Sequence, residues 1–193
     1  KVEVIVVAVP SQYLVQVLQK AKTGPWDRTM VVSVVKGIDP ETGLRMSELI
    51  RKQVPAKKLV VLSGPSISYE VARGVPTTVV AASQDPAVAE EVQTLFATER
   101  FRVYTSTDVI GVELGGALKN VIALSCGAAD GLGFGANTKA ALATRGLVEM
   151  ARLGVAMGAK AETFSGLSGL GDLITTCFSS HSRNRWVGEE LGK

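Results

Sequence analysis

Lys119 is the residue in this sequence with the clearest potential for chemistry. It lies in an apolar, helix-forming segment, residues 109–126, whose polar side chains are Glu113, Lys119, Asn120 and Ser125. Its neighbours one helical turn away are all small or apolar: Gly115, Gly116, Ile122 and Ala123. Apolar surroundings disfavour the charged form of an amine and lower its pKa toward the range useful for proton transfer. We therefore expect Lys119 to be a general acid or base; the alternative is a lysine that reaches solvent at a domain junction.

The same segment holds two features that point to close packing around Lys119. Gly115 and Gly116 each cost a helix about 1 kcal/mol relative to alanine, so their presence predicts that another group packs against the backbone there. Glu113 and Asn120 are one heptad apart and share a helix face. We expect them to position each other or Lys119.

The last third of the chain offers a candidate anion site. A glycine-rich stretch, residues 165–171, is expected to be a flexible turn that delivers the carboxylate of Asp172. Residues 179–185, SSHSRNR, supply hydroxyls and the guanidinium groups of Arg183 and Arg185 where a helix begins. Backbone N–H groups at a helix start, together with an arginine, can hold a phosphate. The alternative to an anion site is an ordinary serine cap at the start of the helix, with Arg185 in solvent. His181 is expected at the surface.

Two halves of different periodicity must position these residues. In residues 1–106, runs rich in Val and Ile alternate with helical patterns, which predicts a mostly parallel, right-handed α/β sheet. The predicted strands are Val2–Val9, Met30–Val35, Leu59–Leu62, Thr77–Ala81 and Arg102–Thr105. The predicted helices between them are Ser11–Lys20, Glu41–Lys52, Ser66–Ala72 and Pro86–Phe96.

The turns after the first three strands are similar to one another. They contain Pro10-Ser11, Lys36-Gly37 and Ser63-Gly64-Pro65-Ser66. The carboxyl ends of parallel strands lie along one edge of the sheet, where open α/β folds bind ligands. We expect either a ligand site with Lys36 as a positive charge, or ordinary turns with a solvated Lys36.

After Asp108 the strand patterns stop. Residues 109–128, 138–157 and 183–191 are predicted to be helical, with glycine-rich breaks at 131–135 and 165–171. We expect an α/β domain over residues 1–114 and a helical domain over residues 115–193, with a cleft between them.

Composition excludes several classes of protein. Hydrophobic residues make up 46% of the 193 residues, which is enough for a core. The net charge of +3 is small and scattered, so no nucleic-acid surface is expected. The longest unbroken apolar run, Val4–Pro10, is too short to span a membrane. Cys126 and Cys177 have no metal-binding spacing, so we expect no metal site and two reduced thiols in a cytoplasmic protein.

An ordered set of motifs resembles a known family. The motifs are AVPS (8–11), VVKGI (34–38), SGPS (63–66), EVARGVPT (70–77), GVELGGALKNV (111–121), GANTKAALATRG (135–146), GLGDL (169–173) and SRN (182–184). Together they are similar to the bacterial NAD(P)-dependent sn-glycerol-3-phosphate dehydrogenases, over nearly the whole chain. The resemblance implies a Rossmann-type sheet followed by a helical domain of the 6-phosphogluconate dehydrogenase type, and NAD or NADP as cofactor.

The resemblance also implies roles for individual residues. Lys119 would be the general acid and base and would contact the substrate, a small phosphorylated molecule (glycerol 3-phosphate or dihydroxyacetone phosphate). The other substrate contacts would be Lys36, Gly64, Ser66, Asp172, Ser182, Arg183 and Asn184. The cofactor contacts would be Lys36, Ser68 and Arg183. The reaction would supply glycerol 3-phosphate for phospholipid synthesis, and a homodimer is left open as the assembly.

The sequence departs from the family at a few places. Ile67-Ser68 stands where the family usually has Phe-Ala, and Phe178 where a Thr often follows the cysteine. The glycine-rich turn of the first strand is absent; Gly131, Gly133 and Gly135 have the wrong spacing and context for it. We therefore expect a truncated chain. A related ketopantoate or β-hydroxyacid reductase, and an inactive fragment that only binds a partner, remain alternatives.

Overall fold

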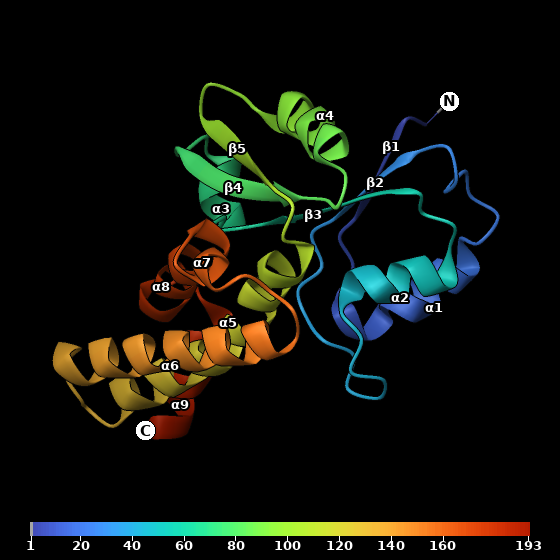
Figure 1. Ribbon diagram of the computed structural model, residues 1–193. Helices are drawn as coiled ribbons and strands as arrows, with labels where there is room; N and C mark the ends of the chain where they lie inside the picture. Colours follow the sequence, from blue (N-terminus) through green and yellow to red (C-terminus); the bar gives the residue numbers. More distant parts are fainter. Residues whose placement is uncertain (1) are drawn as a thin grey trace.

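The computed structural model describes residues 2–193, and its first half is a five-stranded sheet (Figure 1). The strands are β1 (Val4–Val7), β2 (Met30–Ser33), β3 (Lys58–Ser63), β4 (Thr77–Ala82) and β5 (Phe101–Ser106). They lie side by side in sequence order. Every pairing is parallel except that of β3 with β4, which is antiparallel. The prediction of a mostly parallel sheet is confirmed.

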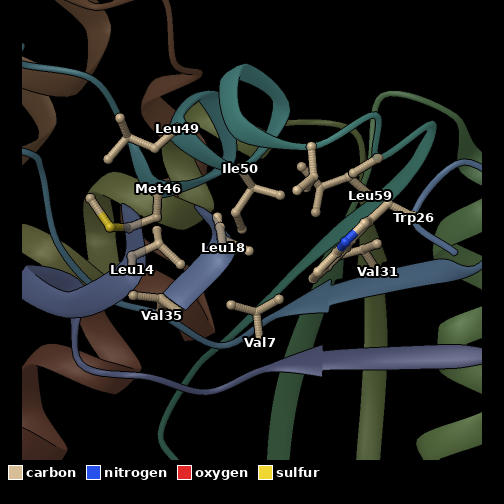
Figure 2. Close-up of a cluster of buried hydrophobic side chains, with 12 residues drawn as sticks. Val7, Leu14, Leu18, Trp26, Val31, Val35, Met46, Leu49, Ile50 and Leu59 are labelled. Atoms are coloured by element: carbon tan, nitrogen blue, oxygen red, sulfur yellow. The ribbon is translucent and has the colours of Figure 1, made fainter. Parts of the chain in front are cut away.

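Both faces of the sheet are covered by helices. Those of this half are η1 (Ser11–Tyr13), α1 (Leu14–Lys20), α2 (Met46–Gln53), α3 (Ser68–Ala72) and α4 (Pro86–Phe96). Side chains alternate along a strand, so Val31 packs with α1 and α2 whereas Val32 packs with α4. Figure 2 shows the first of these cores, a cluster that includes Leu14 and Leu18 of α1, Ile50 of α2 and Val31 of β2. Apolar runs without polar alternation are thus explained by burial on two faces.

The helix predicted over residues 41–52 begins five residues later, at Met46. The preceding residues form a closed loop instead, because Asp39 accepts hydrogen bonds from the backbone and hydroxyl of Thr42. Gly43 has a φ of +68°, which ends any helical path there. Glu48 then accepts from the backbone N–H of Arg45 at 2.9 Å and caps α2. Asx-turn chemistry therefore outweighed helical periodicity.

The second half is helical, as predicted, and is built around one long helix. Its elements are α5 (Val109–Gly131), α6 (Ala136–Ala156), α7 (Ala161–Phe164), the π-helical turn η2 (Leu167–Gly171), α8 (Asp172–Phe178) and α9 (Arg183–Gly192). α6, α8 and α9 all pack on α5. Their core includes Phe164, Leu173 and the free thiols of Cys126 and Cys177.

The glycine-rich stretch at 165–171 is not the flexible turn that we expected. It forms η2, which leads without a break into α8. A Cβ on Gly169 would overlap the carbonyl of Phe164, so this glycine serves close packing rather than mobility. As a result Asp172 is the first residue of a helix, and α7 and α8 are elements that the sequence patterns did not predict.

α5 is also long and apolar enough to cross a membrane by length and composition, with a mean hydropathy of 1.5 over its most apolar window. Half of that window is buried by the rest of the protein. The helix also carries Glu113 and Lys119, whose polar atoms bond to other side chains. We interpret α5 as a core helix of the protein, because a core helix can be equally long and apolar.

The chain passes from the sheet to the helices between Ser106 and Val109. Asp108 fixes this junction, because its carboxylate accepts from the backbone N–H groups of Gly111 and Lys160 and from the hydroxyl of Thr163. The boundary expected at residue 114 lies inside α5 and stays a prediction.

Candidate active site

A cavity of about 230 Å³ lies between the carboxyl ends of the strands and the helical half. Its lining residues are Lys36, Ser66, Ile67, Ser68, Lys119, Asn120, Asp172, Thr175, Thr176, His181, Ser182, Arg183 and Asn184. Its size suits a small metabolite rather than a drug-sized ligand, which usually needs about 300 Å³ or more. A larger hollow of about 710 Å³ lies near the opposite ends of β1–β3, against α4, but contains none of the predicted site residues.

One wall of the first cavity is formed by the segments that follow two strands of the sheet. Lys36 follows β2, and Ser66 and Ser68 follow β3. The turns after β1 and β2 are in contact, because a Cβ on Gly37 would lie 3.0 Å from that of Ser11. β1, β2 and β3 are mutually parallel neighbours, so the prediction that their ends share one edge is confirmed.

Lys119 lies at the bottom of this site, with 7% of its surface exposed. Its ammonium group donates to one oxygen of Asp172 and, at 2.8 Å, to the hydroxyl of Thr176. Lys36 donates to the other oxygen of Asp172 at 2.5 Å. Thr176 donates its own proton to the backbone carbonyl of Asp172 at 2.6 Å, so its hydroxyl can only accept from Lys119. Two lysines therefore share one buried carboxylate.

This arrangement lowers the pKa of Lys119 to about 8. The largest cause is burial, which disfavours the ammonium, and the positive charge of Lys36 acts in the same direction. The carboxylate of Asp172 opposes both effects. An amine with this pKa can donate or accept a proton near neutral pH, as expected from its apolar neighbours in the sequence.

The two glycines before Lys119 make room for other parts of the protein. A Cβ on Gly115 would overlap the carbonyl of Ser168 in η2. A Cβ on Gly116 would lie 2.7 Å from the hydroxyl of Ser63 and 3.4 Å from the side chain of Lys36. The expectation that something packs on the backbone there is confirmed. Of these groups, Lys36 also lines the cavity.

Glu113 and Asn120 do not position each other, contrary to the expectation from their shared face. Glu113 points to α2, where it accepts from Ser47 and Arg45. Burial raises the pKa of its carboxyl, and the bonds from Ser47 and Arg45 oppose that shift. Asn120 instead accepts from the side-chain amide of Asn184 at 2.8 Å. Glu113 and Asn120 lie about two helical turns apart on α5, too far for their side chains to meet, and each bonds to a different element.

α9 provides the opposite wall of the cavity. Its cap is Ser182, whose hydroxyl accepts from the backbone N–H of Arg185 at 3.2 Å. Arg183 and Asn184 line the cavity. Arg185 does not, and the expectation of a second arginine for the anion is wrong: it pairs with Asp130 at 2.7 Å.

Glycines hold α9 against α5. A Cβ on Gly188 would overlap the carbonyl of Leu124, and one on Gly127 would overlap the carbonyl of Arg185. The two helices therefore meet backbone to backbone, which fixes Asn184 beside Asn120.

Most of the predicted site residues meet in this cavity. The ones that line it are Lys36, Ser66, Ser68, Lys119, Asp172, Ser182, Arg183 and Asn184. Gly64 does not line it; with a φ of +144° it packs against Val79 of β4. His181 lies at the cavity beside the ring of Tyr69, 5.1 Å between centroids.

Sequence reasoning missed Thr176. It follows Asp172 by four residues, the spacing at which two side chains meet on one helix face. That signal was present in DLITT, but the sequence patterns predicted only a glycine-rich turn at 165–171 and no helix between it and residue 183, so a helical spacing was not considered there.

Comparison with known proteins identifies the family. The model of the NAD-dependent glycerol-3-phosphate dehydrogenase N-terminus matches residues 1–89, and that of the C-terminus matches residues 108–193. The chain is 51% identical to a glycerol-3-phosphate dehydrogenase [NAD(P)+] of Clostridium perfringens, over 99% of this chain and 58% of the relative. It is 54% identical to the Bacillus subtilis protein of the same name, over 99% of this chain and 56% of the relative.

A solved structure agrees with this. The fold is similar to that of a glycerol-3-phosphate dehydrogenase from Coxiella burnetii, with a TM-score of 0.93 and 39% identity over 98% of this chain and 58% of that one. The chain thus spans somewhat more than half the length of the relatives that it matches. Its Rossmann-type sheet domain, its helical domain and its motifs all belong to the NAD-dependent glycerol-3-phosphate dehydrogenase family.

Proposed function

We propose that the protein carrying this chain interconverts glycerol 3-phosphate and dihydroxyacetone phosphate with NAD(H) or NADP(H). The observation that carries the proposal is that Lys119, with its pKa lowered to about 8, shares one cavity with Arg183 and Asn184. Lys119 supplies a proton-transfer group. Arg183 and Asn184 supply a wall that can bind an anion. Relatives named as glycerol-3-phosphate dehydrogenases support the choice of substrate.

Lys119 moves the proton. In reduction, its ammonium donates a proton to the carbonyl oxygen of dihydroxyacetone phosphate as negative charge develops there. In oxidation, the neutral amine removes the proton of the hydroxyl group. Thr176 and Asp172 accept the other N–H bonds of Lys119, so its remaining position is available to the substrate oxygen.

The wall formed by α9 anchors the phosphate. Arg183 supplies a guanidinium group, and Asn184 and Ser182 supply neutral polar groups at the start of the helix. The free N–H groups and the dipole of a helix start favour a phosphate. Holding that phosphate places the carbonyl carbon at a fixed distance from Lys119, which is a positioning role.

A dinucleotide is too large for this cavity, but three of the lining residues could hold the end of a dinucleotide that reaches the substrate. Lys36 and Arg183 offer positive charge for its phosphates, and Ser68 a hydroxyl, from two walls of the same site. When bound, the nicotinamide supplies or receives the hydride. Lys36, Ser68 and Arg183 would hold and orient it.

Two alternatives lead to different outcomes in one experiment. A ketopantoate or β-hydroxyacid reductase would share the sheet and the lysine, but its substrates lack the phosphate that Arg183 and Asn184 favour. A binding module without catalysis would not need an amine with a lowered pKa.

The test is an assay of the full-length protein with NADH and with NADPH. We expect oxidation of the cofactor with dihydroxyacetone phosphate, and little with ketopantoate or with unphosphorylated dihydroxyacetone. Turnover of ketopantoate instead would favour the first alternative, and no turnover with any substrate would favour the second. The Arg183→Ala variant of the full-length protein serves as a control that keeps Lys119 and the packing of α9 on α5 but removes the guanidinium group from the phosphate wall.

We further propose a cytoplasmic protein that supplies glycerol 3-phosphate for phospholipid synthesis and assembles as a homodimer. Two buried thiols without a disulfide support a reducing compartment. Exposed apolar side chains on the helical half, among them Val121, Trp186 and Leu191, support a protein contact there. Sedimentation of the full-length protein and its location in fractionated cells would test these points.

A further inference from the structure

Glu113 is a buried charged group on α5 with no place in the proton transfer described above. Its side chain is 3% exposed. It accepts from the backbone N–H of Ser47 at 2.8 Å, from the Ser47 hydroxyl at 2.6 Å and from the guanidinium of Arg45 at 2.5 Å. A buried carboxylate that lost these partners would be costly, so the contacts tie α5 firmly to the start of α2.

The partner of Glu113 is connected closely to Lys36. Arg45 pairs with Ile38 through an isolated antiparallel bridge, and Ile38 is two residues after Lys36 in the sequence. A hydrogen bond from the backbone N–H of Asp39 to the carbonyl of Leu44, 2.9 Å long, closes the loop between them. A shift of Arg45 is therefore passed to the backbone beside Lys36.

α5 meets this loop segment at successive turns. Glu113 holds its far end, at Arg45. Gly116, one turn later, leaves space for the stem of Lys36. Lys119, a further turn on, shares the carboxylate of Asp172 with Lys36. The side chains that set the distance between the two lysines thus lie along one stretch of a single helix.

We propose that Glu113 is a positioning residue: by holding Arg45 and Ser47 it fixes the segment that carries Lys36, and so sets Lys36 against the Lys119–Asp172 pair. This inference deepens the proposed function and rests on it, because Lys119 is taken as the proton-transfer group. It assigns a role in the reaction to a residue that does not reach the cavity, whose lining includes Lys36 and Lys119 but not Glu113.

The test is to follow the charge state of Lys119 directly. The groups that face its amine are Asp172 and Thr176 from α8 and Lys36 from the loop after β2. Lys36 lowers the pKa of Lys119, so a Lys36 that moves away lets that pKa rise. The measurement is a ¹³C NMR titration of lysine side chains in the full-length protein, with the Lys119 signal identified by its loss in Lys119→Arg.

Two variants weaken the contact between Glu113 and Arg45. Glu113→Gln keeps an acceptor for Ser47 but faces Arg45 with an amide instead of a negative charge, and Arg45→Met removes the other partner. In both we expect the pKa of Lys119 to rise from about 8 by roughly half a unit to one unit, the scale of a like charge moving a few ångströms away. If Glu113→Gln does not fold, Arg45→Met, at a position that is partly exposed, still gives the result.

The matched control is Asp108→Asn. Asp108 is also buried and also bonds three groups around α5, but at the end away from Lys36. The Asp108→Asn substitution should lower the melting temperature and leave the pKa of Lys119 unchanged. The proposal would be overturned if the pKa of Lys119 did not change in Glu113→Gln and Arg45→Met, or if it rose equally in Asp108→Asn. An absence of turnover with dihydroxyacetone phosphate would refute the proposed function instead and would not alter this titration.

Discussion

Lys36 and Lys119 donate to different oxygens of one carboxylate, that of Asp172. Because two positive charges share one negative charge in a buried place, the group with less access to solvent is the easier one to deprotonate. Lys119 is that group, at 7% exposure. This shared carboxylate holds the Lys119 amine in place, while burial and the charge of Lys36 keep the pKa of Lys119 at about 8.

The simplest consequence concerns the amine itself. Lys119→Ala should lower kcat of dihydroxyacetone phosphate reduction by about 10²-fold or more, the usual contribution of an acid or base group. Lys119→Arg should be nearly as poor, since a guanidinium holds its proton too tightly. Steady-state rates would show this, with exposed Lys160→Ala as the control. Near-normal turnover of Lys119→Ala would remove Lys119 from the role.

The pH dependence should have opposite signs in the two directions. Reduction needs the ammonium of Lys119, so kcat/KM should fall as the pH rises through about 8, the pKa of that group. Oxidation needs the neutral amine, so kcat/KM should rise through the same pH. Initial rates in both directions over a range of buffers would test this. Limbs of the same sign, or limbs at the pKa of an ordinary lysine, would contradict it.

Removal of Lys36 should move those limbs. Lys36→Met takes away a like charge and leaves Asp172 entirely to Lys119, and both effects stabilise the ammonium. We expect the limb to shift to higher pH by roughly one unit. Lys58→Met is a suitable control, because Lys58 pairs with Glu91 in an exposed position away from the cavity. A limb that stays in place would mean that Lys36 does not set the pKa of Lys119.

Much of this site could be predicted because its signals are local. Apolar periodicity located the long helix, and a lysine among glycines and apolar residues indicated its chemistry. The ends of parallel strands place Lys36 and Ser66 at one edge for a topological reason. Pairings between distant segments were less accessible: nothing in the sequence shows that Glu113 meets Arg45 rather than Asn120.

The errors also have a physical pattern. Glycines at 165–171 suggested mobility, but Gly169 lets η2 lie against the backbone at Phe164. Glycine abundance alone does not distinguish a turn from a close contact. Once that stretch is helical, Asp172 and Thr176 fall on one face, and the second acceptor for Lys119 follows.

The pairing of Asn120 with Asn184 should affect binding more than turnover. Asn120→Ala removes the acceptor for the amide of Asn184 and frees that side chain. Loss of one such hydrogen bond is worth about 1 kcal/mol, so KM for dihydroxyacetone phosphate should rise by about fivefold with kcat little changed. Asn120→Asp keeps an acceptor for Asn184 but adds a negative charge to the cavity lining, so it should weaken binding of the phosphorylated substrate further. A fall in kcat at constant KM would show that Asn120 acts on the reacting group instead.

The last prediction concerns the contact that carries α9. Gly188 packs so closely on α5 that a Cβ would overlap the carbonyl of Leu124. Gly188→Ala should therefore push α9 away, lower the free energy of unfolding by about 1–3 kcal/mol, as overpacking usually does, and weaken substrate binding through Arg183 and Asn184. Thermal unfolding and KM would be measured together.

Gly135→Ala provides the control for this change. It lies at the start of α6 with no atom within 4 Å of the added Cβ, so stability and KM should both stay near their original values. If Gly188→Ala lowers stability without raising KM, the phosphate wall does not depend on the position of α9. If neither changes, the two helices have room to separate, and the backbone contact is not what holds Arg183 and Asn184 at the cavity.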